Sequence, residues 1–416
     1  MLNLAHFLDV TANKYPDRTA VILDDFKMTW RELAAYAHRV ANILRSKGIG
    51  KGDKVAMMIP NTPHFPIIYY GILHTGAAVV PVNVLYRQNE IEHYLIDSEA
   101  KVFFAFKMFE EEARKAFMSS ENCKDLIVIS APGDMEDPKV GENFTKIMMQ
   151  ADCNFDTFQT MPDDTAIILY TSGTTGTPKG AELTHFNMFF NAYYACNGIL
   201  KLMPEDVALV TLPLFHSFGQ TCMMNASVLG GSGMTMLPRF ETEKAMQVIE
   251  RDRVTVVALV PTMYFFMLNT EKHLDYDLSS IRMAVSGGAA LPEEIHRRFR
   301  ERHGIVVLEG YGLSETSPIA SFTAEGDEVR VGSIGKPIWG VEMRIKMDDG
   351  SFGGVNEVGE IVIRGHNVMK RYLNRLQATN EAIVNGWFHT GDVGRYDEDG
   401  YFYIVDRKKD IIIRGG

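Results

Sequence analysis

Cysteine is scarce in this chain, and positive charge is outnumbered by negative charge. Only 4 of the 416 residues are cysteine, and they are widely spaced with no Cys-x-x-Cys pair, which argues against a disulfide framework or a thiolate metal site. Isolated cysteines of this kind are typical of buried residues in a cytoplasmic protein. Lys and Arg total 42 against 53 Asp and Glu, so the net charge is −11. Because nucleic-acid binding requires basic surface, this balance argues against a nucleic-acid partner.

Long hydrophobic runs are absent as well. The long uncharged stretch at residues 64–86 is interrupted by prolines, glycines and an asparagine. A membrane-spanning helix is continuous and apolar, so we predict a buried helix that runs into a buried strand. The N-terminus lacks the basic and apolar segments of a signal peptide, and no internal repeat or zinc motif is evident. His296 and His303, which share a charged helix, are interpreted as part of a solvated amphipathic face.

Short β-branched runs alternate with helical patterns along most of the chain, which is typical of α/β units around parallel strands. A capping box at Thr29 and Glu32 marks the start of one helix. The expected fold class is α/β, with two doubly wound sheets packed together. Strands are predicted at residues 54–59, 78–81, 102–105, 166–170, 207–212, 254–260, 283–286 and 306–308, and helices at 29–47 and 292–303.

The character of the sequence changes after about residue 320. Turns rich in Gly, Asp and Asn separate short runs such as 359–365 and 401–405, a pattern that indicates antiparallel strands. We expect two α/β subdomains over about residues 1–320 and a small antiparallel β-barrel over about 321–405. Residues 410–416 have the pattern of an apolar strand that ends on a turn signal, which indicates a chain that is cut short there.

The most informative segment is residues 170–180, a run of glycines, threonines and one serine that ends in Pro178, Lys179 and Gly180. Glycines let backbone N–H groups turn toward an anion, the hydroxyls add donors, and the lysine adds a positive charge. The segment is not a P-loop, because the lysine lies between Pro178 and Gly180 instead of in the Gly-Lys-Ser/Thr order of that motif. We predict a phosphate-binding loop of another kind. A flexible Gly/Thr linker is the weaker alternative.

Four further segments carry distinctive sequences. They are LPLFHSFG at residues 212–219, GYGLSET at 310–316, WFHTGD at 387–392 and DRKKD at 406–410. Together with the phosphate loop, in this order and over essentially the whole chain, they resemble the adenylate-forming superfamily of acyl-CoA synthetases, firefly luciferase and peptide-synthetase adenylation domains. One such segment arises readily by chance, whereas five in order form a strong signal.

The resemblance implies a ligase reaction in two steps. A carboxylate attacks the α-phosphorus of ATP to give an acyl-adenylate and pyrophosphate, and the thiol of coenzyme A then attacks the acyl carbon and expels AMP. Such chemistry needs backbone donors, a cation and Mg²⁺ to neutralise the polyphosphate. By resemblance, the catalytic residues are Thr171, Lys179, His216 and Glu315, with Thr171 and Glu315 as the magnesium ligands. Without the motif, Glu315 is more simply a carboxylate at a helix start.

The resemblance also assigns the nucleotide contacts. Tyr311 lies against adenine, Asp392 accepts the ribose hydroxyls, and Arg407 lies near the ribose or phosphate. Without the family match, Tyr311 is more simply a turn or core residue, and a turn role for Asp392 is about equally plausible. The complete expected nucleotide-binding set is Thr171, Ser172, Gly173, Thr174, Thr175, Gly176, Lys179, Gly287, Gly288, Ala289, Gly310, Tyr311, Gly312, Thr316, Asp392 and Arg407.

His216 is assigned to positioning of the acid substrate. A single histidine in an apolar segment is usually a satisfied core residue, but the matching position in the family faces the carboxylate being activated. Amino-acid-activating relatives place an aspartate near this point, so His216 favours an uncharged acyl or aryl tail. The expected pocket also includes Ser217, Gln220, Thr221 and residues 260–264. We favour a medium- or long-chain fatty acid, with an aryl acid such as a hydroxycinnamate second.

Members of the family continue past the DRKKD segment into a smaller mobile domain of about a hundred residues. We therefore interpret residues 1–408 as the N-terminal adenylate-forming domain and 409–416 as the hinge and the truncated start of a C-terminal domain. Because that mobile domain closes the site, we expect this chain to bind nucleotide but to turn over poorly. The expected partners are ATP, coenzyme A and a small carboxylic acid. Peripheral membrane contact and the oligomeric state stay open.

Two other kinds of function share these motifs. A non-catalytic nucleotide-binding homologue would bind ATP with magnesium without releasing pyrophosphate. A light-emitting oxidase would consume luciferin, ATP and oxygen. Assays for pyrophosphate and for light separate both of them from an acid–thiol ligase.

Overall fold

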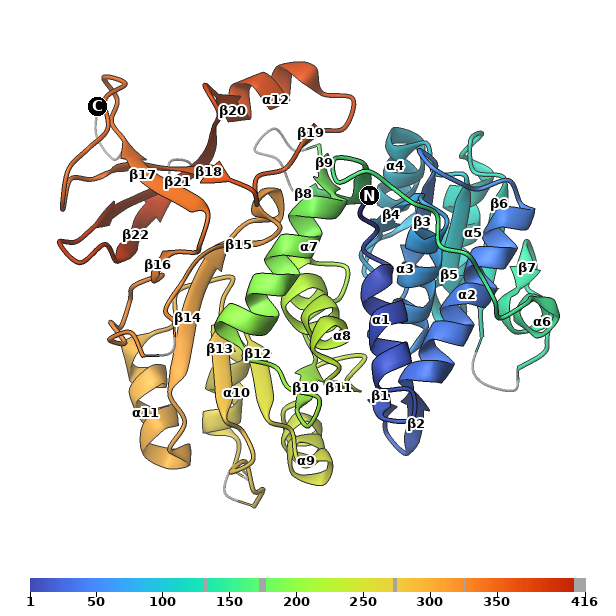
Figure 1. Cartoon of the computed structure of the whole chain (residues 1–416), viewed down its shortest axis with the longest axis horizontal. Coiled ribbons are helices and arrows are strands. Elements are labelled where there is room, and N and C mark those ends of the chain that lie inside the picture. Colours follow the sequence, from blue (N-terminus) through green and yellow to red (C-terminus); the bar gives the residue numbers. More distant parts are fainter. Residues whose placement is uncertain (131–133, 172–176, 272–274, 325, 408–416) are drawn as a thin grey trace.

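The computed structural model describes residues 1–130, 134–171, 177–271, 275–324 and 326–407. Within these ranges the strands form sheets of nine, eight and five strands. Figure 1 shows the two large sheets beside each other, with the smallest sheet across one end of the nine-stranded sheet. The predicted α/β fold, with two large wound sheets and a small antiparallel unit, is confirmed.

The eight-stranded sheet is parallel in its middle and antiparallel at the edge formed by β8, β9 and β19. Its strand order is β19 (Arg371–Tyr372), β9 (Lys179–Thr184), β8 (Thr165–Thr171), β4 (Ala78–Pro81), β3 (Lys54–Met58), β5 (Val102–Phe106), β6 (Asp125–Ile129) and β7 (Glu142–Asn143). The helices of this region are α2 (Trp30–Ser46), α3 (His64–His74), α4 (Gln88–Ser98), α5 (Glu110–Met118) and α6 (Phe144–Gln150), with the short η1 (Lys107–Phe109).

The nine-stranded sheet takes its first two strands from the N-terminus and the rest from the middle of the chain. Its order is β16 (Lys336–Pro337), β15 (Ile319–Phe322), β14 (Val307–Gly312), β13 (Met283–Ser286), β12 (Val256–Leu259), β10 (Val207–Val210), β11 (Gly233–Met236), β1 (Thr19–Leu23) and β2 (Phe26–Thr29). The accompanying helices are α1 (His6–Lys14), α7 (His185–Tyr194), α8 (Ala226–Gly230), α9 (Thr242–Asp252), α10 (Pro261–Asn269) and α11 (Glu293–His303), with the π-helices η2 (Ala195–Ile199) and η3 (Phe218–Asn225) and the 3-10 helix η4 (Ser314–Thr316).

The smallest sheet is antiparallel throughout. Its strands are β17 (Val341–Lys346), β18 (Gly359–Gly365), β21 (Trp387–Tyr396), β20 (Ile383–Val384) and β22 (Phe402–Arg407), and α12 (Leu376–Ala382) precedes β20. Along β17 buried residues alternate with exposed ones, because successive side chains of a strand point to opposite faces. The predicted strand at residues 359–365 coincides with β18.

Local signals in the sequence set several element boundaries. The capping box forms as predicted at the start of α2, where Thr29 Oγ1 accepts from the Glu32 N–H and Glu32 accepts from the Thr29 N–H. The solvated interpretation of α11 is wrong for His296, which is buried together with Phe299. The two residues lie three apart on one face of the helix, and that face packs on the core.

Residues 64–86 fold into α3 followed by β4, as predicted, and nearly all of both elements is buried. The helix stops at His74 and the chain passes Gly76 before the strand begins. In the part of the chain that the structure describes, no helix has the length and apolar character needed to cross a bilayer.

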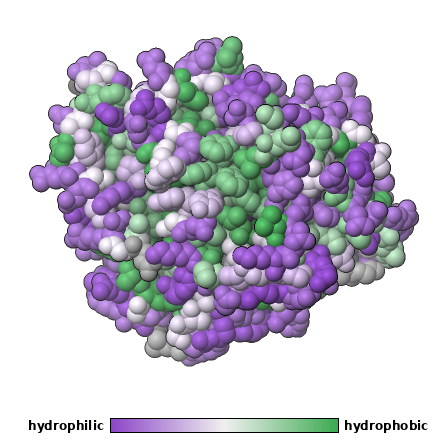
Figure 2. Space-filling model, viewed as in Figure 1, coloured by the Kyte–Doolittle hydropathy of each residue, from purple (hydrophilic) through white to green (hydrophobic). Residues whose placement is uncertain are grey.

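Apolar side chains gather in the middle of one face of the molecule, over α7 and α1 (Figure 2). On α7, Phe186 and Tyr193 are exposed, and the nearby Trp339 is 70% exposed. The Trp339 ring stacks on Phe190 with 5.5 Å between ring centroids. The rings of this surface thus contact one another while remaining open to solvent.

His185 is a fully buried histidine at the start of α7. Its Nδ1 accepts a hydrogen bond from the Leu4 N–H at 3.1 Å, and burial lowers the pKa of His185 to about 4. In the unfolded chain a histidine titrates near ~6.5. Below that pH the unfolded state binds a proton that the folded state does not. The free energy of unfolding contributed by neutral His185 is therefore fully present above pH ~6.5 and is lost as the pH falls toward 4.

Replacing His185 with glutamine tests this pH dependence. The glutamine oxygen can accept the Leu4 N–H but does not titrate, so between pH ~7 and ~5 the His185→Gln variant is expected to lose about 2 kcal/mol less unfolding free energy than the wild type. Urea unfolding at the two pH values measures the difference. Equal losses in both proteins would contradict the prediction.

Candidate functional site

The predicted phosphate loop connects β8 and β9, two adjacent antiparallel strands. Thr171 ends β8, Lys179 begins β9, and the two residues are paired across the ladder. The hairpin therefore holds the two ends of the loop, one with a hydroxyl and one with an ammonium group, next to each other. Five members of the predicted set lie outside the described residues, namely Ser172, Gly173, Thr174, Thr175 and Gly176.

Glu315 lies in the turn η4, directly after β14, and its carboxylate reaches the end of β8. Its Oε1 accepts hydrogen bonds from the Thr171 hydroxyl at 3.0 Å and from the Tyr372 hydroxyl at 2.9 Å. The whole residue is only 8% exposed. The chain can fold back here because Gly312 has no side chain: a Cβ at this position would lie 1.8 Å from the Pro318 carbonyl oxygen. The structure thus brings both expected magnesium ligands into contact.

Tyr372 connects this carboxylate to the predicted lysine. Its strand β19 pairs with β9, opposite Ala181, and the Lys179 ammonium lies over the Tyr372 ring at 5.4 Å from the centroid. Burial raises the pKa of Tyr372, and the charge of Glu315 raises it further. The phenol therefore stays protonated and donates to the carboxylate at all ordinary pH values.

Tyr311 and Asp392 form a second contact between predicted residues. The Tyr311 hydroxyl donates to Asp392 Oδ2 at 2.6 Å, although the two residues are 81 positions apart. Asp392 is 3% exposed, and it lies on β21 opposite Arg407 of β22 in the backbone register. A strand of the nine-stranded sheet and a strand of the small sheet thus meet at this hydrogen bond.

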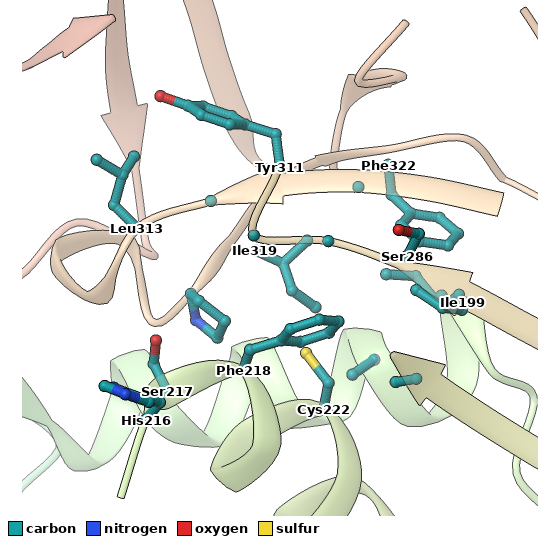
Figure 3. Close-up of a pocket in the computed structure, with 18 of the residues that line it drawn as sticks. Ile199, His216, Ser217, Phe218, Cys222, Ser286, Tyr311, Leu313, Ile319 and Phe322 are labelled. Carbon is teal, nitrogen blue, oxygen red and sulfur yellow. The ribbon is translucent and has the colours of Figure 1, made fainter. Parts of the chain in front are cut away.

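An apolar cavity of about 210 Å³ lies beside Tyr311 (Figure 3). The Phe218 ring and the Cys222 sulfur point into its middle, with His216 and Ser217 at one end and Ile199 and Phe322 toward the other. Four predicted glycines line it, namely Gly287, Gly288, Gly310 and Gly312.

Two predicted residues next to these glycines lie elsewhere. Ala289 is exposed and does not line the cavity. Thr316 is fully buried, and its hydroxyl is used inside the turn, where it donates to the Pro318 carbonyl and accepts from the Leu313 N–H. Thr316 thus stabilises the turn that presents Glu315.

His216 lies at an end of the cavity and keeps part of its ring exposed to solvent. Desolvation by the surrounding protein lowers the pKa of His216, so the imidazole is neutral at physiological pH. Gln220 and Thr221, which were expected in the pocket, are fully buried and do not line it. They lie on η3 between Phe218 and Cys222, where both side chains are enclosed by the protein.

Residues 260–264 also do not line this cavity. They begin α10, and Tyr264 packs in the core under α9 and α11, where its hydroxyl donates to the Val285 carbonyl. The prediction that this segment follows a strand is correct. The side of the sheet that the next helix covers depends on tertiary packing, which the sequence pattern does not show.

The donor set around Glu315 fits a magnesium ion. Both hydroxyl donors use Oε1, and among the described residues none donates to Oε2. Thr171 Oγ1 uses its proton on Glu315 and keeps lone pairs for a cation. A carboxylate and a hydroxyl are the hard oxygen ligands that magnesium prefers.

A family model described as AMP-binding enzyme matches residues 8–373. The chain belongs to this family. A long-chain-fatty-acid–CoA ligase from Bacillus subtilis (strain 168) is 35% identical to it over 99% of this chain and 78% of that protein. A feruloyl-CoA synthase from Amycolatopsis sp is 34% identical over 97% of this chain and 78% of that protein. Fatty-acid and aryl-acid ligases are thus both among the relatives of this AMP-binding enzyme.

The solved structures agree with this assignment. The crystal structure of the anthranilate CoA ligase AuaEII in complex with anthranoyl-AMP superimposes with a TM-score of 0.94 at 25% identity and covers 100% of this chain and 79% of that chain. The AMP-binding enzyme described here is therefore a member of the AMP-forming acyl-CoA ligases, which join an acid to a thiol.

Sequence reasoning missed three residues of this site. Tyr372 follows the run 359–365 in a segment that matched no expected motif, and the two residues of its strand β19 carry no periodic signal. Phe218 and Cys222 lie next to the predicted His216, and their spacing of four residues was a usable signal for one helical face. Once η3 is known to be helical, that spacing indicates that Phe218 and Cys222 line the same wall of the cavity.

Replacing Tyr372 with phenylalanine tests the contact to Glu315. The variant keeps the ring beneath Lys179 but loses one hydrogen bond to a buried carboxylate, so its unfolding free energy is expected to fall by about 2 kcal/mol. Urea unfolding measures the loss. The control Tyr36→Phe removes the hydroxyl of an exposed tyrosine on α2 and is expected to change stability by less than about 0.5 kcal/mol. Equal effects of the two variants would contradict the prediction.

Proposed function

We propose that this enzyme activates a fatty-acid carboxylate with ATP and transfers the acyl group to coenzyme A. The observation that carries the proposal is that a single cavity borders both the residues proposed to bind the nucleotide and the apolar residues proposed to bind the acid. Tyr311, which contacts Asp392, lines the same space as Ile199, Cys222 and Phe322. A nucleotide and an apolar acid would therefore share a wall.

The reaction consists of two displacements. In the first, a carboxylate oxygen forms a bond to the α-phosphorus of ATP while the bond to the bridging oxygen breaks and pyrophosphate leaves. In the second, the sulfur of coenzyme A forms a bond to the acyl carbon, the thiol proton is lost, and AMP leaves with the electrons of the acyl–oxygen bond. Both steps need a stable orientation of the acid and neutralisation of phosphate charge.

The residues around the hairpin would handle that charge. Lys179 supplies a cation at the end of the predicted loop, and the loop backbone and hydroxyls would bind the phosphates as proposed from the sequence. Thr171 and Glu315 would hold magnesium, which neutralises polyphosphate charge when it is bound. Tyr372 keeps the Glu315 carboxylate oriented through its 2.9 Å hydrogen bond.

The nucleoside would lie at the second contact. Asp392 is an ionisable acceptor with two oxygens, which suits a pair of ribose hydroxyls, and the Tyr311 ring offers a flat apolar face for adenine. Gly287, Gly288 and Gly310 leave room for close approach of the base. Arg407, on the strand next to Asp392, is proposed to contact the ribose or phosphate.

His216 is proposed to position the carboxylate. It lies at an end of the cavity with Ser217, and as a neutral imidazole it can donate one hydrogen bond to the acid without forming a tight ion pair. A neutral donor suits a carboxylate that must remain nucleophilic.

A fatty acid is favoured by the apolar lining and by the identity to the Bacillus subtilis ligase. The lining includes Ala195, Ile199 and Leu200 without a charged side chain other than the titratable His216. An aryl acid is the second candidate, because a cavity of about 210 Å³ is compact and the feruloyl-CoA synthase is almost as similar. We place the enzyme in the cytoplasm as part of the proposal, since its cysteines are free.

Pyrophosphate release across a panel of acids tests the function. We expect release with fatty acids, greatest for medium or long chains between acetate and palmitate, and less with coumarate or ferulate. Residues 1–416 alone are expected to bind ATP but to turn over at least about tenfold more slowly than a fusion to the C-terminal part of the Bacillus subtilis relative, because closure completes such sites.

The other outcomes of this assay identify the alternatives. Preference for coumarate would make the enzyme an aryl-acid ligase. ATP binding without pyrophosphate from any acid, in the fusion as well, would make the chain a non-catalytic homologue. Light on addition of luciferin, ATP and oxygen would make it an oxidase.

The magnesium assignment has its own test. Glu315→Gln keeps the shape of the side chain but removes its charge, so the magnesium concentration for half-maximal pyrophosphate release by the fusion is expected to rise more than about tenfold. Glu309→Gln is the matched control, because Glu309 lies on β14, the strand that precedes Glu315, and accepts from the Leu291 N–H instead. An unchanged magnesium requirement in Glu315→Gln would contradict the assignment.

A further inference from the structure

A second cluster of ligating side chains lies outside the cavity, where the first three helices meet. Asp9 comes from α1, His38 from α2 and His74 from the last position of α3. One potential ligand atom from each lies within 4.8 Å of the other two. Asp9 Oδ1 is 3.0 Å from His38 Nε2 and 3.8 Å from His74 Nε2.

The hydrogen bonds of His38 bring its Nε2 next to an oxygen of Asp9. Its Nδ1 is 3.2 Å from the Cys153 carbonyl oxygen, which can only accept, so Nδ1 carries the proton. In a neutral imidazole Nε2 is then a lone pair. Yet Nε2 faces a carboxylate oxygen at 3.0 Å, and two acceptors at that distance repel unless a proton or a metal ion lies between them.

The hydrogen bonds of His74 lead to the same conclusion. The Thr157 hydroxyl donates its only proton to Asp9 Oδ2 at 3.0 Å, so it must accept from His74 Nδ1, which is 2.8 Å away. His74 is fully buried. With Nδ1 protonated, Nε2 of the neutral imidazole carries a lone pair, and this buried atom has no hydrogen-bond partner among the described residues.

We propose that Asp9, His38 and His74 bind a zinc ion. Two imidazole nitrogens and a carboxylate are a zinc donor set, and nitrogen ligands disfavour magnesium or calcium. Ligands at about 2.1 Å from a tetrahedral zinc are about 3.4 Å apart, and the observed separations of 3.0 and 3.8 Å lie on either side of that value. The remaining position is left for water, since the Asp9 and His38 side chains are 21% and 19% exposed.

The surroundings of the cluster are those of a built metal site. Metal-bound histidines usually donate their other ring N–H to an oxygen, which fixes the tautomer. Here the Cys153 carbonyl oxygen accepts from His38 Nδ1, and the Thr157 hydroxyl oxygen accepts from His74 Nδ1. Zinc would thus join α1, α2 and α3 to the segment that contains residues 153 and 157.

The test uses the untagged 416-residue chain. The protein purified without chelator is expected to hold about one equivalent of zinc, and Co²⁺ added to the chelated protein is expected to give a visible ligand-field band. Removal of zinc lowers Tm by several degrees, and zinc restores it. Asp9→Asn and His38→Gln are each expected to weaken zinc affinity by more than about tenfold and to abolish the zinc-dependent Tm shift.

The control is His303→Gln, which removes an imidazole on α11 and is expected to bind zinc as the wild type does. If both cluster variants unfold, the wild-type zinc content and Co²⁺ band still decide the question. A wild type that holds no zinc and gives no Co²⁺ band would overturn the proposal and identify the cluster as an ion pair with a protonated His38. Wild-type affinity in both cluster variants would also overturn it. Neither result bears on pyrophosphate release, so this proposal and the proposed function fail separately.

Discussion

The rest of the site depends on the hydrogen bonds that the Glu315 carboxylate accepts. This carboxylate is buried, and a buried carboxylate without partners is strongly unfavourable. Its partners are the hydroxyls of Thr171, from the eight-stranded sheet, and Tyr372, from a short strand added to that sheet's edge. Glu315 itself follows a strand of the nine-stranded sheet. The same pair of hydrogen bonds therefore connects the two large sheets and holds the Glu315 carboxylate at the end of β8, beside the proposed phosphate loop.

Much of the fold was accessible from the sequence because its signals are local. Residues 78–81 and 283–286 are short, mostly apolar runs with clear ends, and they form β4 and β13 with the predicted bounds. Thr29 and Glu32 mark the start of α2 because the capping box involves only residues three apart. The contact between Thr171 and Glu315 was expected from the family motifs, since no local rule relates residues 144 positions apart.

What the sequence did not reveal depends on tertiary packing. Tyr372 became part of the site only because β19 pairs with β9, and a strand of two residues has no periodicity to detect. His296 was expected on a solvated face, but the helix packs that face on the core. The cluster of Asp9, His38 and His74 is spread over three helices, and its chemistry is visible only when these helices pack against one another.

The ladder between β8 and β9 fixes the two ends of the proposed phosphate loop independently of the residues between them. The register that pairs Thr171 with Lys179 belongs to the sheet, so the points where the chain leaves and returns do not depend on what lies between them. Loops generally accept changes in length and composition more readily than the elements that carry them. Substitutions among the few residues between the two strands can therefore change how such a loop binds an anion. The Thr171 hydroxyl, which donates to Glu315, would stay in position.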